Sequence, residues 1–287
     1  MLENELPSQT ALTAAAARAA HLIVDTDPPI FADVLASALL GDQAEEFIGY
    51  HRAHGPHPVL SAARAQVTCR SRYTEDRLAD SLRRGVTQYV MLGAGLDSFA
   101  YRSALASRVH VFEVDHPATQ QWKLTQLRKA GIPVPDGVTF VGADFESSSL
   151  ADGLIRCGFD LSRPALVSWL GVTMYLTRGA ISQTLAQVSG FAAGTVLVTD
   201  YMLPASLRDA AGASYADQVM PVAAEHGEPW LTCLAPGEMS ALLEGHGFGM
   251  GEHVGQRDSI DAALWDRSDS LRPIGLSVLA QAIIPPR

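Results

Sequence analysis

From residue 87 onward, short apolar runs alternate with segments of helical periodicity, and this alternation constrains the fold more than any other feature of the chain. Strands that alternate with helices are joined by right-handed crossovers, so they predict a mainly parallel sheet with helices on its faces. Seven strands are predicted: Gln88–Leu92, Val109–Val114, Val138–Val141, Ala165–Leu170, Thr195–Thr199, Gly249–Val254 and Leu276–Ile283. Because no long helix separates the last two, we expect a variant of the doubly wound α/β sheet.

Helix signals accompany the strands. Proline opens helices at Pro117 and Pro236, and Thr177 is placed to cap a third. The chain before the first strand is helical by its periodicity, with predicted helices over Thr10–His21, over Ile30–Leu40, and from Val59 to a stop at Gly85. These patterns predict a helical segment that precedes the sheet.

Composition excludes several classes of partner. The formal net charge is −10, which disfavours a polyanion because nucleic-acid binding depends on neutralising phosphates. The apolar runs are too short to span a bilayer, and the acidic segment 1–5 does not resemble a secretory signal. The three cysteines, Cys69, Cys157 and Cys233, stand far apart, as expected for reduced thiols. The sequence therefore predicts a cytoplasmic protein without nucleic-acid or membrane partners.

A glycine motif follows the first predicted strand. Residues 90–98 read Val-Met-Leu-Gly-Ala-Gly-Leu-Asp-Ser, so an apolar strand runs into Gly93 and Gly95 and then into a predicted helix. Glycines at this turn let a ligand approach the backbone without a Cβ in its path. Asp115 lies 20 residues after Gly95, at the end of the second strand, where an acid can bind ribose hydroxyls. The pattern predicts an adenosine-containing ligand.

The kind of adenosine ligand is indicated by what the motifs lack. A dinucleotide fingerprint has a third glycine where this chain has Ser98. The chain has only two lysines, Lys123 and Lys129, and the residues four positions before them are Thr119 and Thr125, so a Tyr-x-x-x-Lys pair is excluded. Neither lysine follows a glycine, which excludes a P-loop. S-adenosyl-L-methionine, which carries no phosphate, fits the remaining pattern.

Three histidines, His51, His54 and His57, are close enough in sequence to suggest a metal site. The Gly55-Pro56 pair interrupts any helix that would align them, and no carboxylate follows at ligand spacing. We therefore expect no metal.

Several blocks of the sequence resemble the leucine carboxyl methyltransferase family, which includes bacterial polyketide carboxyl methyltransferases. Residues 92–102 (LGAGLDSFAYR) are similar to its LGAGLDTRAYR block. Similar blocks are found at residues 70–73 (RSRY), 112–117 (FEVDHP), 142–145 (GADF) and 169–177 (WLGVTMYLT). The resemblance implies an S-adenosyl-L-methionine-dependent O-methyltransferase with a Rossmann-like, seven-stranded methyltransferase sheet, a helical N-terminal cap and a lid insertion.

One methyltransferase domain is expected over residues 1–287, because the chain shows no repeat, linker or change of composition. We divide it into a helical cap (1–85), a cofactor-binding half (86–200), a lid insertion (201–236), and a C-terminal helix and strands (237–287).

The resemblance also assigns cofactor contacts. Arg70 takes the methionine carboxylate, with Arg72 as the second choice. Gly93 and Gly95 are implied to line the cofactor backbone, and Asp115 to bind the ribose. Asp144 is implied to contact the adenine amine, and Phe145 the edge of the adenine ring.

One position departs from the family pattern. Many relatives carry a glutamate just before the glycine that follows the fourth strand, and this chain has Leu170 before Gly171. An acid that faces the cofactor is therefore missing or replaced. The departure keeps open the alternative of a non-methylating protein that retains the fold.

A carboxylate acceptor is the most specific functional prediction. It follows from the resemblance and from the lack of a nameable catalytic base, since a carboxylate is already ionised at neutral pH. We name no catalytic residue, and we predict substrate contacts for Trp169, Tyr175 and Tyr201. The alternatives are methylation of a hydroxyl on a natural-product scaffold and, from another class, a nicotinamide oxidoreductase. The expected partner is a small-molecule or peptide carboxylate.

Overall fold

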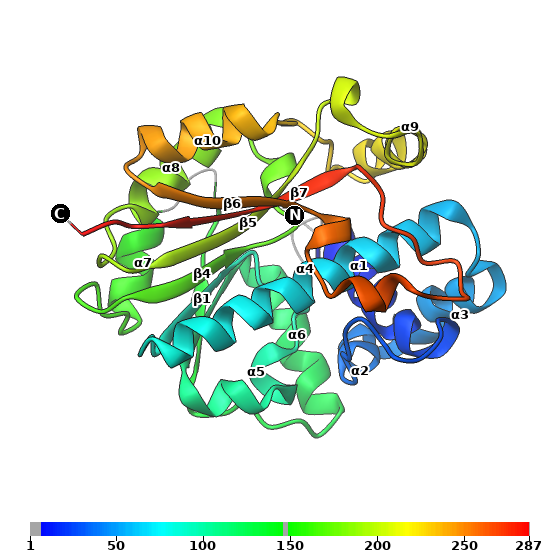
Figure 1. Ribbon diagram of the computed structural model, residues 1–287. Helices are drawn as coiled ribbons and strands as arrows, with labels where there is room; N and C mark the ends of the chain where they lie inside the picture. The colour runs from blue at the N-terminus through cyan, green and yellow to red at the C-terminus, as the bar shows by residue number, and fades with distance from the viewer. Residues whose placement is uncertain (1–6, 146–148, 287) are drawn as a thin grey trace.

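The computed structural model describes residues 7–145 and 149–286. A seven-stranded sheet crosses the molecule in the order β3-β2-β1-β4-β5-β7-β6 (Figure 1). The strands are β1 (Gln88–Leu92), β2 (His110–Asp115), β3 (Val138–Gly142), β4 (Ala165–Trp169), β5 (Val196–Met202), β6 (Gly249–Gly255) and β7 (Ser277–Ile283). Neighbours from β3 to β5 are parallel, whereas β7 is antiparallel to β5 and β6. The predicted α/β sheet is confirmed, and each predicted strand overlaps an observed one.

Helices cover both faces of the sheet. One core layer joins it to α7 (Leu150–Arg156), α8 (Arg178–Val188) and α10 (Pro236–Gly245), and a second joins the opposite face to α4 (Pro58–Arg83) and α5 (Phe99–Arg102). The remaining helices are α1 (Gln9–Val24), α2 (Ala36–Leu40), α3 (Ala44–His54), α6 (Pro117–Lys129) and α9 (Ala210–Glu225). No helix in the two described ranges is long and apolar enough to cross a membrane.

The predicted helix over Ile30–Leu40 is wrong in its first half, because α2 begins only at Ala36. The backbone N–H of Ile30 donates to His21 Nε2 at 2.9 Å, and that of Leu35 donates to Asp33 Oδ1 at 3.2 Å. Ile30 also packs in a different apolar cluster from the residues of α2. Side chains therefore take the donors and the packing that a continuous helix would need.

The predicted lid insertion also begins too early. Tyr201 belongs to β5, is 1 % exposed, and its hydroxyl lies 2.9 Å from His253 Nδ1. Strand β5 extends to Met202 because it pairs with β7 over its whole length. Beyond the strand, α9 packs against α4 of the cap and forms the helical part of the insertion.

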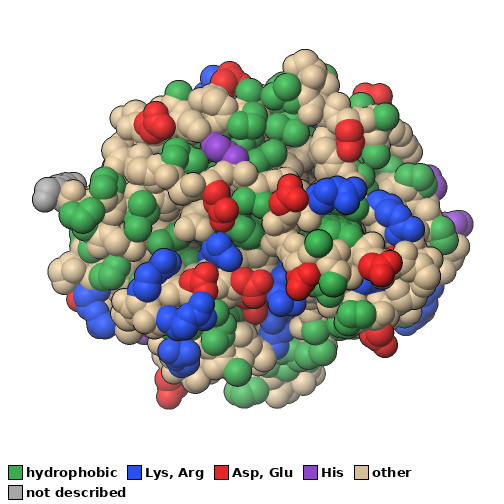
Figure 2. Space-filling view, in the orientation of Figure 1, with side chains coloured by type: hydrophobic (Ala, Val, Ile, Leu, Met, Phe, Trp, Pro, Cys, Tyr) green, Lys and Arg blue, Asp and Glu red, His purple; other side chains and the backbone are tan. Residues whose placement is uncertain are grey.

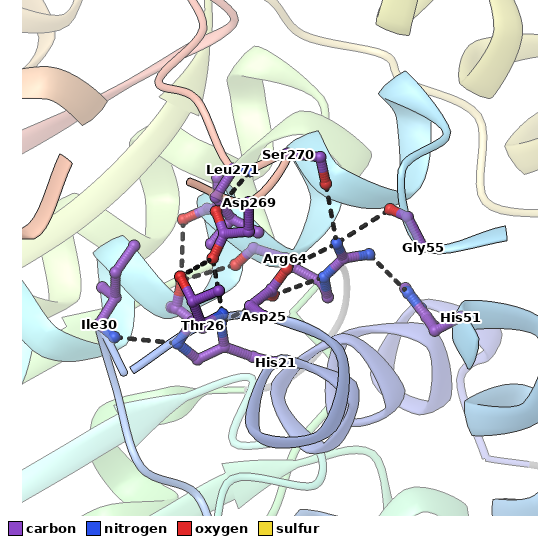
Figure 3. A network of polar contacts seen from close by, with 12 residues as sticks. His21, Asp25, Thr26, Ile30, His51, Gly55, Arg64, Asp269, Ser270 and Leu271 are labelled. Carbon is purple, nitrogen blue, oxygen red and sulfur yellow. Dashed lines mark hydrogen bonds and ion pairs between the residues drawn. The ribbon is translucent and has the colours of Figure 1, made fainter. Parts of the chain in front are cut away.

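A buried polar network attaches the cap to the C-terminal part of the chain (Figure 3). Arg64 of α4 binds both carboxylate oxygens of Asp25, at 2.7 and 2.9 Å, and lies 3.5 Å from the hydroxyl of Ser270. His21 Nδ1 contacts the same carboxylate at 2.9 Å, and His51 lies beside the guanidinium. Burial, together with Arg64, lowers the pKa of His51 to about 4. These histidines serve the packing of the cap, which is thereby held over the sheet.

Candidate functional site

A cavity of about 260 Å³ opens at the carboxyl ends of β1, β2 and β4. The strand order reverses between β1 and β4, and ligands of doubly wound sheets bind at such a switch point. The loops after the strands form its floor, and Thr10, Ala11, Ala14 and Arg18 of α1 line it from the cap. The volume is near the lower end of the range for small-molecule sites.

The glycine turn forms one wall of this cavity. Gly93 has a φ of +71° and Gly95 a φ of +52°, which is the left-handed region that favours glycine. A Cβ on Gly93 would lie only 2.3 Å from a methyl carbon of Val172, and one on Gly95 would lie 3.3 Å from Ala11. The two glycines therefore allow the backbone, the end of β4 and the cap helix to meet at the cavity wall.

Asp115 lies at the end of β2 and lines the same wall, as the spacing predicts. Its carboxylate accepts hydrogen bonds from the backbone N–H of Gly95 at 2.5 Å and of His116 at 2.7 Å. Burial raises the pKa of Asp115, and the two backbone donors act in the opposite direction. The acid is thus held rigidly, with further lone pairs available to hydroxyl donors in the cavity.

Asp144 and Phe145 follow β3 and also line the cavity. They come together with Asp115 because the parallel strands β2 and β3 end at the same edge of the sheet. This end of the cavity therefore offers two carboxylates and one aromatic ring.

Arg70 of α4 lines the cavity at its other end and pairs with Asp200 of β5, with 3.3 Å between Nη1 and Oδ2. Arg72 instead pairs with Asp76 on the surface of the same helix, where its side chain is 43 % exposed. Of the two predicted arginines, only Arg70 is placed to bind a ligand in this cavity.

The three predicted substrate contacts have different positions. Tyr175 lines the cavity, whereas Trp169 is 1 % exposed in the apolar core against α7 and α8. Side chains alternate along a strand, so the neighbours of Trp169, Ser168 and Leu170, face the cavity instead. Tyr201 is buried in the same core layer. The predictions for Trp169 and Tyr201 are therefore wrong in placement.

Sequence reasoning missed a polar chain that leads from the cavity lining to Glu228. Thr10 Oγ1 lies 2.5 Å from Glu228 Oε2 and 3.2 Å from the hydroxyl of Tyr175. Threonine has one hydroxyl proton, which the carboxylate attracts more strongly, so Tyr175 donates to Thr10 and Thr10 to Glu228. Burial raises the pKa of Tyr175, so its hydroxyl stays protonated. Sequence separations of 165 and 218 positions leave no local signal for this relay.

The chemistry of the lining fits a nucleoside that carries an amino-acid tail. Asp115 suits ribose hydroxyls, Asp144 and Phe145 suit a base, and Arg70 suits a carboxylate at the opposite end.

Comparison with known proteins agrees with this site. The model of a protein family described as leucine carboxyl methyltransferase matches residues 11–189, a range that runs from α1 to α8. YktD of Bacillus subtilis (strain 168), named as a candidate S-adenosyl-L-methionine-dependent methyltransferase, is 33 % identical over 94 % of this chain and 95 % of its own length. A similarly named protein of Mycobacterium marinum is 36 % identical over 47 % of this chain and 45 % of its own.

Solved structures share the fold at low sequence identity. A protein of the DUF574 family from Streptomyces avermitilis superposes with a TM-score of 0.65 and 14 % identity, over 99 % of this chain and 100 % of its own. A protein from Thermobifida fusca described as a candidate methyltransferase gives a TM-score of 0.62 and 16 % identity, over 99 % of this chain and 97 % of its own. With the family match over most of the cap and the cofactor-binding half, these findings show that the chain belongs to the leucine carboxyl methyltransferase family.

Proposed function

We propose that the protein transfers a methyl group from S-adenosyl-L-methionine to a carboxylate oxygen of a small acidic molecule or a peptide carboxyl terminus. The observation that carries the proposal is the match of residues 11–189 to a family described by carboxyl methylation, because that range builds most of the cavity. The relatives are named for S-adenosyl-L-methionine-dependent methyl transfer, and the nicotinamide oxidoreductase alternative is therefore wrong.

In this proposal the cofactor lies along the cavity from β3 to α4. Asp115 binds the ribose, Asp144 and Phe145 bind the adenine, and Arg70 binds the methionine carboxylate. Gly93 and Gly95 form the wall between these groups. All of these residues line the one cavity, although they come from a cap helix and three strand ends.

The ribose assignment gives the first prediction. Replacing Asp115 by alanine is expected to weaken cofactor binding about tenfold or more, because a hydrogen bond to a charged group contributes roughly 1.5–3 kcal/mol. Isothermal titration with S-adenosylhomocysteine measures the change, and the melting temperature of the variant reports whether the fold is intact. A folded variant with the affinity of the unchanged protein would remove Asp115 from the ribose site.

In this reaction the main task of the protein is to position the acceptor and the cofactor, and no proton has to be transferred. The cofactor supplies a methyl group activated by a positively charged sulfur. Helix α1 lines the cavity from the cap, so it would help to hold the acceptor in attack geometry and to exclude water. A carboxylate with a pKa of about 4 is already ionised at neutral pH and needs no general base.

A methyl ester is the expected product, and it gives the second prediction. The ester should release methanol in mild alkali, and its rate of formation should not fall steeply from about pH 8 to pH 6, since the acceptor stays ionised over that range. Mass spectrometry of the product before and after alkali, together with a pH–rate profile, checks both statements.

Methylation of a hydroxyl on a natural-product scaffold is a second candidate, favoured by the relay from Tyr175 through Thr10 to Glu228. A hydroxyl acceptor has to lose a proton, and this chain of hydrogen bonds leads from the cavity to a carboxylate. The product would then be an ether that survives alkali. An alkali-stable product from the natural substrate therefore overturns the ester proposal and supports this one.

We further propose that the acceptor is not a nucleic acid and that the reaction takes place in the cytoplasm. On the face shown in Figure 2, acidic and basic side chains are interspersed, without the continuous basic surface that a phosphate backbone requires. Acidic residues outnumber basic ones by 31 to 21. The cysteines Cys69, Cys157 and Cys233 are free thiols, a form that a reducing compartment maintains.

A further inference from the structure

The acid that Leu170 replaces has a neighbour on the adjacent strand. Strands β4 and β5 are parallel, with Trp169 opposite Thr199, so the next residues, Leu170 and Asp200, follow side by side at the cavity end of the sheet. Asp200 is 1 % exposed. A carboxylate thus lies one strand away from the position where many relatives of the family carry a glutamate.

Asp200 holds two parts of the site together. One carboxylate oxygen accepts the backbone N–H of Gly171 at 2.6 Å, and the other lies 3.3 Å from Nη1 of Arg70. Gly171 has a φ of +71°, and a Cβ there would lie 2.6 Å from the guanidinium nitrogens of Arg70. The guanidinium is therefore confined between the Gly171 backbone and the Asp200 carboxylate, which limits the directions in which Arg70 can bind a ligand.

The charges of Arg70 and Asp200 suit the amino-acid end of the cofactor. An arginine and an aspartate that are both shielded from water remain charged only when they offset each other. The methionine end of S-adenosyl-L-methionine carries a carboxylate and an ammonium group, so it is complementary to a site that holds one charge of each sign. With Leu170 in place of the family acid, Asp200 is the carboxylate bound to Arg70, and it lies behind the cavity lining rather than in it.

We infer that Asp200 is the positioning residue for the amino-acid end of the cofactor, where it aims Arg70 and supplies the negative charge that Leu170 removes. The inference rests on the proposed assignment of Arg70 to the methionine carboxylate. It assigns Asp200 no contact with the acceptor. Loss of Asp200 should therefore weaken binding of the amino-acid end of the cofactor and leave binding of the nucleoside unchanged, because Asp144, Phe145 and Asp115 are proposed to bind the adenine and the ribose elsewhere in the cavity.

The test compares two ligands that differ in the amino-acid end. S-adenosylhomocysteine carries it and 5′-methylthioadenosine lacks it, so the ratio of their dissociation constants, measured by isothermal titration, isolates the contribution of this end. Asp200→Asn is expected to weaken S-adenosylhomocysteine binding about tenfold or more and to change methylthioadenosine binding less than about twofold. Retained methylthioadenosine binding also shows that the variant is folded.

Two further variants sharpen the result. Asp209→Asn is the matched control, since Asp209 is a carboxylate that accepts backbone N–H groups at the start of α9, outside the cavity, and both affinities should stay unchanged. Leu170→Glu added to Asp200→Asn returns an acid to the family position and should recover a large part of the lost selectivity. Where Asp200→Asn does not fold, Asp200→Glu keeps the charge but moves the carboxylate by one methylene, and the same selective loss is expected.

Failure of the inference is distinct from failure of the proposed function. An equal loss of both affinities in Asp200→Asn, or no loss of either, overturns the positioning role while the cofactor assignment stands. If the unchanged protein binds neither ligand, the proposed function itself is wrong. If it binds both equally well, Arg70 does not bind the methionine carboxylate and the inference falls with that assignment.

Discussion

Replacing Gly93 by alanine is expected to weaken cofactor binding on the order of a hundredfold. The new methyl group would lie 2.3 Å from Val172 Cγ2, so Val172, in the loop after β4, has to move by about 1 Å or more to reach ordinary contact. Val172 itself lines the cavity, so moving it also moves the wall that the cofactor would contact. A misplacement of about 1 Å can lower a reaction rate on the order of a hundredfold, and we expect a loss of the same order in cofactor affinity. Isothermal titration with S-adenosylhomocysteine measures the effect.

Gly131 is the matched control for this substitution. It has a φ of +67°, close to that of Gly93, and a Cβ there would meet nothing within 4 Å. Gly131→Ala therefore imposes the same backbone strain, about 1–2 kcal/mol, without a clash in the cavity. Gly93→Ala should lose more stability than Gly131→Ala in urea denaturation, because it adds the clash with Val172 to the shared backbone strain, and only Gly93→Ala should lose cofactor affinity. Equal affinity in the two variants would contradict the role of the glycine turn.

Replacing Lys123 by methionine is expected to lower the free energy of unfolding by about 3–5 kcal/mol, the usual cost of leaving one partner of a buried ion pair alone. Lys123 Nζ lies 2.7 Å from Glu113 Oε2, and each side chain is 1 % exposed. The other lysine offers the control, because the pair of Lys129 with Asp42 is largely exposed to solvent. Lys129→Met should change stability by less than about 1 kcal/mol in the same urea denaturation experiment.

The pH dependence of Lys123→Met follows from Glu113. Burial raises the pKa of Glu113 and the Lys123 cation lowers it, so removing the cation raises the pKa further. An acid whose pKa is raised on folding loses stability as the pH rises through its folded value, so the defect is greatest at neutral pH and shrinks as the pH falls. Adding Glu113→Gln should restore much of the stability at neutral pH. A defect that persists unchanged in acid would show that packing, not charge, causes it.

Local sequence patterns specify the sheet and the half of the site that lies on neighbouring strand ends. Each central strand is a short apolar run because both of its faces are buried, and this signal is local. The turn at Gly93 and Gly95 and the acid at Asp115 follow from spacing along the chain, since the carboxyl ends of parallel strands meet at one edge. Arg70 came from the family resemblance, and the structure places it at the same cavity.

Other features could not be read locally. The periodicity of Ile30–Leu40 is that of a helix, yet the side chains of His21 and of Asp33 take backbone donors of its first half. The predicted strand ends at Thr199, which leaves Tyr201 in the predicted lid. Pairing with β7, which lies far along the sequence, extends the strand through Tyr201. Which face of β4 would carry Trp169 depends on where the helices pack, and a run of apolar residues does not contain that information.

The polar contacts at the two ends of the cavity depend on the tertiary structure alone. The relay through Thr10 joins the cap to Glu228 beyond α9, across 218 positions, and the pair of Arg70 with Asp200 joins the cap to β5 across 130. Such contacts depend on how α1 and α4 cross the sheet, and that is set by packing of the whole core, not by any segment alone. The residues proposed to bind the nucleoside therefore lie in local motifs, whereas the contacts around Arg70 and Thr10 exist only once the cap has folded onto the sheet.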